Sequence, residues 1–147
     1  MSSLIMIYAS MTGNTGEIAE AIAEGVREAG LDLVEKEVMD ASASELKQYD
    51  GILLGAYTWG DGELPDEFLD FYEDMDQLDL SGKKVAVFGS CDSAYEHVGA
   101  AVDLLIAKAT ERGAEVVLEG LKIELAPSAA EKEACKSFGD AFAKQFG

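Results

Sequence analysis

The sequence predicts a three-layer α/β/α domain: a parallel sheet of five strands in the order 2-1-3-4-5, with helices on both faces. Apolar runs alternate with amphipathic stretches along the whole chain, which is the rhythm of a parallel sheet with crossover helices. Three apolar runs are nearly continuous, as in strands buried on both faces. The length of 147 residues suits one domain, so we expect residues 1–147 to form a single domain.

The charge content of the strands predicts their order. Charged residues such as Glu35 and Lys122 interrupt the second and fifth strands, which is what sheet edges tolerate. Right-handed crossovers then place strands one, three and four in the middle. Ligands of such sheets bind at the carboxyl ends of the strands, so the loops after strands one, three and four are the candidates for a site. The expected strands are Leu4–Tyr8, Leu31–Val38, Gly51–Ala56, Lys83–Phe88 and Glu115–Leu125.

Amphipathic segments between the strands predict the helices. Apolar residues recur at helical spacing, and we expect these stripes to face the core and to carry no function. Gly30 and Gly113 stand where helix C-caps belong. A short helix is expected at Ala43–Gln48. The stripes are Ile18, Ile22 and Val26 in the first helix, Val102, Leu105, Ile106 and Ala109 in a later one, and Ala134, Phe138, Ala141 and Phe142 in the last, while Phe68, Leu69, Tyr72 and Met75 outline a helix after Pro65.

The charge and cysteine content exclude several classes of function. The chain has 29 acidic and 11 basic residues and a formal net charge of -18, so nucleic acid and anionic membranes would repel it. We expect basic protein partners and a monomer. Cys91 and Cys135 are too few for an iron–sulfur cluster or a structural zinc site, and one disulfide between them is conceivable. The apolar run Leu4–Ile7 is too short for a signal peptide or a membrane span, so a cytoplasmic location is expected.

The loop after the first strand has the composition of a phosphate site. It reads Ser10-Met11-Thr12-Gly13-Asn14-Thr15, and a helix begins there. Gly13 permits a sharp turn, and the helix N-terminus offers free N–H donors and a partial positive charge. No Lys or Arg is present, so neutral donors for one phosphate are expected rather than a nucleoside triphosphate loop. Ordinary N-capping by Asn14 or Thr12 is the alternative.

The loop after the third strand carries the only tryptophan, within Tyr57-Thr58-Trp59-Gly60-Asp61-Gly62-Glu63-Leu64-Pro65. A structural Trp usually fills core from a strand or helix. On a glycine-rich loop, Trp59 is better placed to cover a planar ligand, and Gly60 and Gly62 allow backbone conformations closed to other residues. A tight turn with Trp59 packed on the domain edge is the alternative.

The loop after the fourth strand offers a second aromatic residue. It reads Gly89-Ser90-Cys91-Asp92-Ser93-Ala94-Tyr95-Glu96, so Tyr95 and Trp59 could sandwich one ring system. Tyr95 could instead be a surface residue at a helix start. Cys91 is expected to be a small packing residue rather than a nucleophile, because no histidine partner is evident. His97, the sole histidine, is most simply an exposed side chain.

These three loops, in this order and spacing, resemble those of flavodoxins over the whole chain. The first matches the family's [ST]-x-T-G-x-T phosphate loop, and the second, Thr58–Pro65, looks like its second flavin loop. The third matches its D-S-x-Y-E at Asp92, Ser93, Tyr95 and Glu96. The flavodoxin-like fold has the strand order 2-1-3-4-5 and binds FMN at the switch point between strands one and three. Because the last strand runs to Pro127 without a long insertion, the chain resembles the short-chain type.

The resemblance implies FMN as a non-covalent cofactor. The first loop would hold the phosphate, Thr58 would lie near the phosphate and ribityl chain, and Gly60 would lie beside flavin N5. Trp59 and Tyr95 would flank the isoalloxazine ring, and Asp92 would meet its pyrimidine edge. No residue is expected to be catalytic or to bind metal. The cofactor-binding residues so implied are Ser10, Met11, Thr12, Gly13, Asn14, Thr15, Thr58, Trp59, Gly60, Asp61, Gly62, Ser90, Cys91, Asp92 and Tyr95.

The resemblance also implies a role as an electron carrier rather than an enzyme. We expect a low-potential protein that passes single electrons between a reductase and acceptor proteins. The acidic segment 61–79 would attract these partner proteins through their basic surfaces. An FMN-dependent NAD(P)H or quinone reductase on the same fold is the alternative, and a binding module without redox activity stays open. A signalling receiver domain is rejected, because Tyr57-Thr58 and Ala126-Pro127 stand where that fold needs Asp and Lys.

Overall fold

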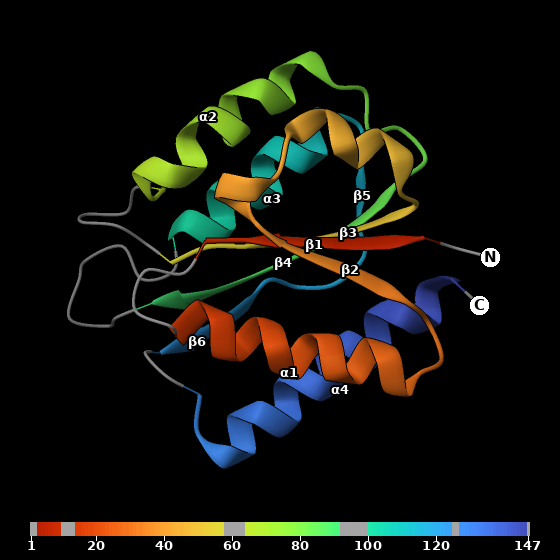
Figure 1. Cartoon of the computed structure of the whole chain (residues 1–147), viewed down its shortest axis with the longest axis vertical. Coiled ribbons are helices and arrows are strands. Elements are labelled where there is room, and N and C mark those ends of the chain that lie inside the picture. The colour runs from red at the N-terminus through yellow and green to blue at the C-terminus, as the bar shows by residue number, and fades with distance from the viewer. Residues whose placement is uncertain (1–2, 10–13, 58–63, 92–99, 125–126, 147) are drawn as a thin grey trace.

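A parallel sheet with two helical layers forms the domain in the computed structural model, which describes residues 3–9, 14–57, 64–91, 100–124 and 127–146. The strands are ordered β2-β1-β3-β4-β5, and β6 also pairs with β4, so the predicted fold class and order are confirmed. In Figure 1, α2 and α3 cover one face of the sheet, and α1 and α4 cover the other. The strands are β1 (Leu4–Tyr8), β2 (Leu33–Glu37), β3 (Gly51–Gly55), β4 (Lys84–Cys91), β5 (Glu115–Val116) and β6 (Leu121–Glu124).

The predicted fifth strand is two short strands rather than one. Its first part, β5, pairs with the start of β4, and its second part, β6, pairs with residues Phe88–Cys91. The chain between them passes close under α3 (Ala100–Glu111), because a Cβ on Gly120 would come within 2.7 Å of a Val102 methyl carbon. A glycine inside a strand often marks such a close approach and weakens the strand.

The fourth strand is longer than predicted. Its pairing with β6 extends it from Phe88 to Cys91. Ser90 and Cys91, which were expected in the loop, therefore belong to the strand. Sequence reasoning ended the strand too early because Gly and Ser have low strand propensity, whereas the neighbouring strand supplies the pairing.

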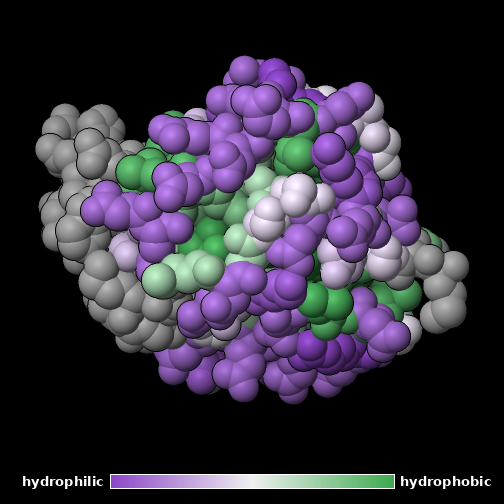
Figure 2. Space-filling model, turned by 45° about the horizontal axis from the view of Figure 1, so that its top comes forward, coloured by the Kyte–Doolittle hydropathy of each residue, from purple (hydrophilic) through white to green (hydrophobic). Residues whose placement is uncertain are grey.

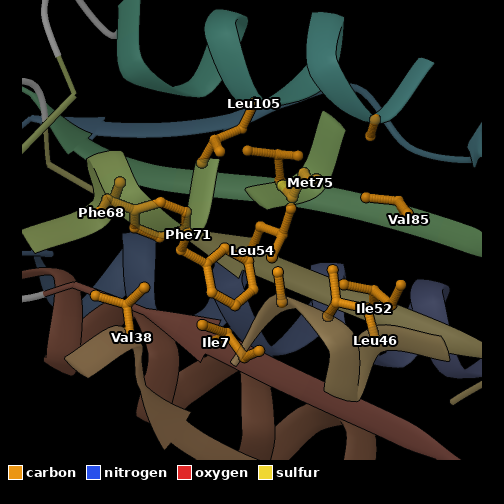
Figure 3. Close-up of a cluster of buried hydrophobic side chains, with 14 of the residues drawn as sticks. Ile7, Val38, Leu46, Ile52, Leu54, Phe68, Phe71, Met75, Val85 and Leu105 are labelled. Carbon is orange, nitrogen blue, oxygen red and sulfur yellow. The ribbon is translucent and has the colours of Figure 1, made fainter. Parts of the chain in front are cut away.

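The core between the sheet and the α2–α3 layer is built largely from aromatic and branched side chains (Figure 3). In α2 (Asp66–Asp74), Phe68 and Phe71 are buried, with ring centroids 5.4 Å apart in an edge-to-face arrangement. The helix expected after Pro65 is thus confirmed, but Leu69 is 39% exposed and Phe71 takes its place in the core. Met75 is buried in η3 (Met75–Gln77), a short 3-10 helix that continues α2.

The opposite layer packs α1 (Asn14–Glu28) against α4 (Ala129–Ala143) at very short range. A Cβ on Gly25 would lie 2.1 Å from the Lys136 carbonyl oxygen, and a Cβ on Gly139 would lie 2.1 Å from the Ile22 carbonyl oxygen. The two glycines therefore let the helix backbones touch.

The expected apolar stripe of α1 is confirmed, while that of α4 is partly wrong. Ile18, Ile22 and Val26 of α1 are fully buried. In α4, Ala134 is exposed. The face of α4 that packs on α1 is centred on Gly139 and is turned away from the predicted stripe. A stripe drawn through the larger apolar residues misses this rotation, because the contact depends on a residue without a side chain. The buried residues of α4 are Cys135, Gly139, Phe142 and Ala143.

The helix ends and short helices follow the sequence closely. Gly30 and Gly113 end α1 and α3 with φ values of 95° and 94°, as the C-cap prediction requires. The short helix predicted at Ala43–Gln48 is present as a 3-10 helix, η2, and the Glu45 side chain accepts a hydrogen bond from the Ser42 N–H at 2.7 Å. Two further 3-10 helices are η1 (Val38–Asp40) and η4 (Lys144–Phe146).

Candidate functional site

The carboxyl ends of β1, β3 and β4 meet at one edge of the sheet (Figure 1). The Ala9 N–H donates to the Gly55 carbonyl at 3.0 Å, and the Ala56 N–H donates to the Phe88 carbonyl at 3.3 Å. The three strands are thus held in register up to the points where the candidate loops leave them. This confirms that the chain returns three times to the same edge.

Only part of the predicted site falls within the described residues. Asn14 is half-buried as the first residue of α1, Thr15 and Ser90 are buried, and Cys91 ends β4. The other predicted positions lie outside the described residues, as does His97. Those positions are Ser10, Met11, Thr12, Gly13, Thr58, Trp59, Gly60, Asp61, Gly62, Asp92 and Tyr95.

A buried pair of hydroxyl groups joins the start of α1 to the end of β4. Thr15 Oγ1 and Ser90 Oγ lie 2.8 Å apart, and the two residues are only 1% and 5% exposed. Successive strand residues face opposite sides of a sheet, so Ser90 shares the α1–α4 side with Phe88, which packs in that core. Sequence reasoning assigned both residues to cofactor binding but missed their contact, which depends on the extension of β4 past Phe88.

A second contact joins the two ends of the segment that contains the tryptophan loop. The Tyr57 hydroxyl donates to Glu67 Oε1 at 3.1 Å, and Glu67 lies in the first turn of α2. Burial, and then the Glu67 carboxylate, raise the pKa of Tyr57 to about 12, so the phenol stays protonated as a donor. The sequence signal for this contact is weak, because an aromatic residue before a loop and an acid in the next helix are both common.

The sequence itself carries a family relationship. The sequence model of the flavodoxin family matches residues 6–139. The chain belongs to the flavodoxin family. It is 48% identical to probable flavodoxin 2 of Bacillus subtilis (strain 168) over 148 residues, which cover 100% of this chain and 98% of that protein. It is 39% identical to the flavodoxin of Maridesulfovibrio salexigens over 97% of this chain and 98% of that one.

Solved structures agree with this assignment. The crystal structure of oxidised flavodoxin 1 from Bacillus cereus is 59% identical to this chain, with a TM-score of 0.97, and the match covers 99% of this chain and 100% of that one. Flavodoxin 2 from the same organism gives 50% identity and a TM-score of 0.95. These matches support a flavodoxin of the short-chain type.

Flavodoxins bind FMN and carry electrons to redox partner proteins rather than acting as enzymes, and nothing favours the reductase alternative. The described residues fit a phosphate-bearing flavin. The helix α1 begins at Asn14, directly after the first loop, and its first turn holds the Thr15 hydroxyl. Neutral donors at a helix N-terminus suit a phosphate group. When bound, FMN supplies the one-electron chemistry, and the protein supplies orientation and electrostatics.

The α2 layer next to this edge is strongly acidic. Figure 2 shows a largely hydrophilic face with apolar side chains in a hollow. A groove beside α2 is lined by Val38, Met39, Ala41, Ser42, Ala43, Asp66, Glu67, Asp70, Phe71 and Asp74. Met39 at the groove is 74% exposed. Lys108 of α3 contacts Asp76 and lies 4.4 Å from the centroid of the Tyr72 ring. Residues 64–79 contain no Lys or Arg, so the other acidic residues of this segment have no basic residue within it.

Three further features of the described residues concern cysteine, metal ions and membranes. Cys135 is a buried free thiol, so it is not part of a disulfide, and burial raises its pKa to about 11. Within the described ranges, no group of three or more His, Cys, Asp or Glu side chains could hold a metal ion. None of the helices in the described part of the chain has the length and apolar content needed to cross a bilayer.

Proposed function

We propose that this flavodoxin carries single electrons at low potential between basic-surfaced redox proteins, as a cytoplasmic monomer with residues 1–147 as one domain. The observation that carries the proposal is the convergence of β1, β3 and β4 at one edge, with α1 starting there. Ligands of open parallel sheets bind at this edge, where the winding of the sheet reverses.

Each of the three loops would bind a different part of the cofactor. The first loop and the start of α1 would hold the phosphate with hydroxyl and backbone donors, and Thr58 would lie near the phosphate and the ribityl chain. Trp59 and Tyr95 would cover the two faces of the ring. Gly60 would lie beside N5, and Asp92 with neighbouring backbone groups would meet the pyrimidine edge. The motif residues support this division, and the buried Thr15 and Ser90 at the base of the edge agree with it.

The acids of α2 would serve two purposes. They would oppose the build-up of negative charge beside them, which lowers the potential of a flavin held at this edge. They would also attract basic partner proteins, with association rates that fall as salt rises. The charge of the whole chain, -18, supports both effects and favours a monomer.

A binding titration with matched variants tests the proposal. Apoprotein is titrated with FMN, and flavin fluorescence and the visible spectrum report binding. We expect one FMN per chain, and Trp59→Ala and Tyr95→Ala should each weaken binding by about 1–3 kcal/mol if the rings stack on the flavin. Tyr49→Ala, remote from this edge, is the control and should leave FMN affinity unchanged. Unchanged affinity in both loop variants would refute the assigned ring-covering roles.

A kinetic experiment tests the role as a carrier. The reduced protein is mixed with a lysine-rich cytochrome c, a basic one-electron acceptor, at increasing ionic strength. The proposal predicts a second-order rate that falls steeply with salt, because opposite charges steer the encounter. Reduction of the flavin by NADPH alone, at a rate matching turnover and without a reductase protein, would favour an enzyme instead.

A further inference from the structure

The contact between Thr15 and Ser90 lies where two candidate cofactor loops leave the fold. Thr15 is in the first turn of α1, after the phosphate loop, and Ser90 is one residue from the end of β4. Their hydroxyl oxygens lie 2.8 Å apart and are 75 positions apart in the chain. Both side chains are buried, so bulk water does not compete for this hydrogen bond.

The direction of that hydrogen bond decides what Thr15 can do. A hydroxyl group has one proton to donate and two lone pairs to accept with, so only one of the two protons lies between the oxygens. If Thr15 donates to Ser90, its proton is used and the group offers an anion only lone pairs. If Ser90 donates to Thr15, the Thr15 proton stays available for a phosphate oxygen.

We propose that Ser90 is a positioning residue for the phosphate of FMN: it donates its proton to Thr15 Oγ1, so that Thr15 can donate to the phosphate. The inference rests on the proposed function of the first loop as the phosphate site. Because the loop sequence contains no Lys or Arg, each neutral donor matters more here than in a site with a cation. Hydrogen bonds to a charged acceptor are roughly twice as strong as those between neutral groups.

The position of Ser90 suits this role because it lies on a strand that is paired with a neighbour at that residue. β4 pairs with β3 up to Phe88 and with β6 at Ser90, which is opposite Ile123. A side chain on a paired strand has less freedom than one on a loop, so it orients its partner at a lower entropic cost. The contact also links the end of β4, from which the Tyr95 loop leaves, to the start of the helix that follows the phosphate loop.

A double-mutant cycle with two ligands tests the inference. Riboflavin has the same ring and ribityl chain as FMN but no phosphate, so it reports changes that do not involve the phosphate. Apoprotein variants Ser90→Ala, Thr15→Val and the double variant are titrated with FMN and with riboflavin. We expect Ser90→Ala to weaken FMN binding about 3- to 10-fold and Thr15→Val about 10- to 100-fold, with riboflavin affinity unchanged. In the Thr15→Val background, Ser90→Ala should add no further loss, because the residues act through one hydrogen bond.

Two control variants separate the hydrogen bond from packing. Ser90→Cys keeps nearly the same volume but is a weak donor, so it should weaken FMN binding as much as Ser90→Ala does. Thr110→Val removes a hydroxyl that donates to the Ile106 carbonyl on α3, away from this edge, and should change neither affinity.

The titrations with the two ligands distinguish a role of Ser90 in phosphate binding from a purely structural role. Equal losses of FMN and riboflavin affinity in Ser90→Ala would show a purely structural role and overturn the inference. Additive losses in the double variant, or full FMN affinity in Ser90→Ala, would overturn it as well. Failure of the unaltered protein to bind FMN would refute the proposed function itself, whereas normal FMN binding with any of these three results refutes only the role of Ser90.

Discussion

The two helical layers of this domain are built by different means. In the α1–α4 layer, Gly25 and Gly139 let the helix backbones touch, and small residues surround the contact. In the α2–α3 layer, large side chains such as Phe68, Phe71 and Met75 separate the helices from the sheet. The first layer holds α1, the helix that follows the candidate phosphate loop, through backbone contacts at Ile22 and Gly25. The second layer depends on side-chain volume and presents a charged outer face.

The layers also differ in how their charges are balanced. On the α1–α4 side, Lys136 lies 3.2 Å from Glu24, and Arg27 lies 2.7 Å from Glu35 at the edge of the sheet. On the other side, α2 has acids without a basic residue in the helix, while the nearly buried Lys108 contacts Asp76 of η3 and Lys122 lies 3.1 Å from Asp103 of α3. We infer that the first layer serves the cofactor and the second layer serves the partner proteins. The following variants test that division.

The largest effect is expected from truncating a core aromatic residue in the α2–α3 layer. Phe68 is fully buried against Phe71, so Phe68→Ala leaves a cavity and should lower the free energy of unfolding by about 3–5 kcal/mol. Leu69→Ala, at the next position of the same helix, removes a side chain that is 39% exposed and should cost below about 1 kcal/mol. Urea denaturation of both variants measures the difference. Similar losses in the two would contradict the assignment of the buried face of α2.

A smaller loss is expected from adding one methyl group to the α1–α4 contact. Ala is a better helix former than Gly by about 1 kcal/mol, so Gly139→Ala would stabilise a free helix. Here the new Cβ would meet the Ile22 carbonyl at 2.1 Å, and the helices must separate. We expect a net loss of about 1–3 kcal/mol by thermal or urea denaturation. Ser137→Ala, on the exposed side of α4, is the control and should be neutral or slightly stabilising; a stabilised Gly139→Ala would contradict the backbone contact.

Charge neutralisation should separate the functions of the two outer faces. Asp70→Asn with Asp74→Asn removes two exposed acids beside the groove, whereas Glu28→Gln with Glu133→Gln removes two exposed acids of the α1–α4 layer. The first pair should raise the potential of the second one-electron step by a few tens of millivolts, since ~59 mV corresponds to a tenfold change. It should also slow electron transfer to a basic acceptor at low salt. Equal effects of the two pairs in redox titrations and stopped-flow mixing would remove the distinction between the faces.

The smallest effect is expected from the hydrogen bond between Tyr57 and Glu67, and it appears as a pH dependence of stability. The folded pKa of Tyr57 is raised from 10.0 to about 12, so the folded state holds this proton more tightly than the unfolded state. Its contribution is complete below pH 10 and is lost as the pH rises toward 12. The stability advantage of the unaltered protein over Tyr57→Phe should therefore shrink between pH 10 and pH 12 in urea denaturation. A constant difference would show that burial and the Glu67 carboxylate do not raise the pKa of Tyr57 in the folded state.

The sequence predicts this fold well where the spacing and number of apolar residues determine which side chains are buried. Continuous apolar runs identify the central strands, and Gly30 and Gly113 mark helix ends because only glycine takes a positive φ readily. Errors arise where a neighbour decides the outcome. β4 runs to Cys91 because β6 pairs with it, and α4 turns Ala134 outward because Gly139 must face α1. Neither effect is visible in a single helix or strand.

The candidate site shows the same division. Loop motifs identify the residue types that a flavin needs, and the family relationship agrees with them. Contacts between distant segments, such as Thr15 with Ser90 and Tyr57 with Glu67, escape sequence reasoning, because they depend on the register of strands and the direction of side chains. From sequence alone, a hydroxyl group near a binding motif is assigned to cofactor binding, even where it forms a hydrogen bond with a neighbouring residue instead.

The most direct test is a visible spectrum of the purified protein, recorded with added FMN and during stepwise reduction at controlled potential. The account predicts a yellow protein with one FMN per chain, released on denaturation, and reduction in two separate one-electron steps. A colourless protein that takes up no FMN, or a bound flavin reduced only in a single two-electron step, would contradict it.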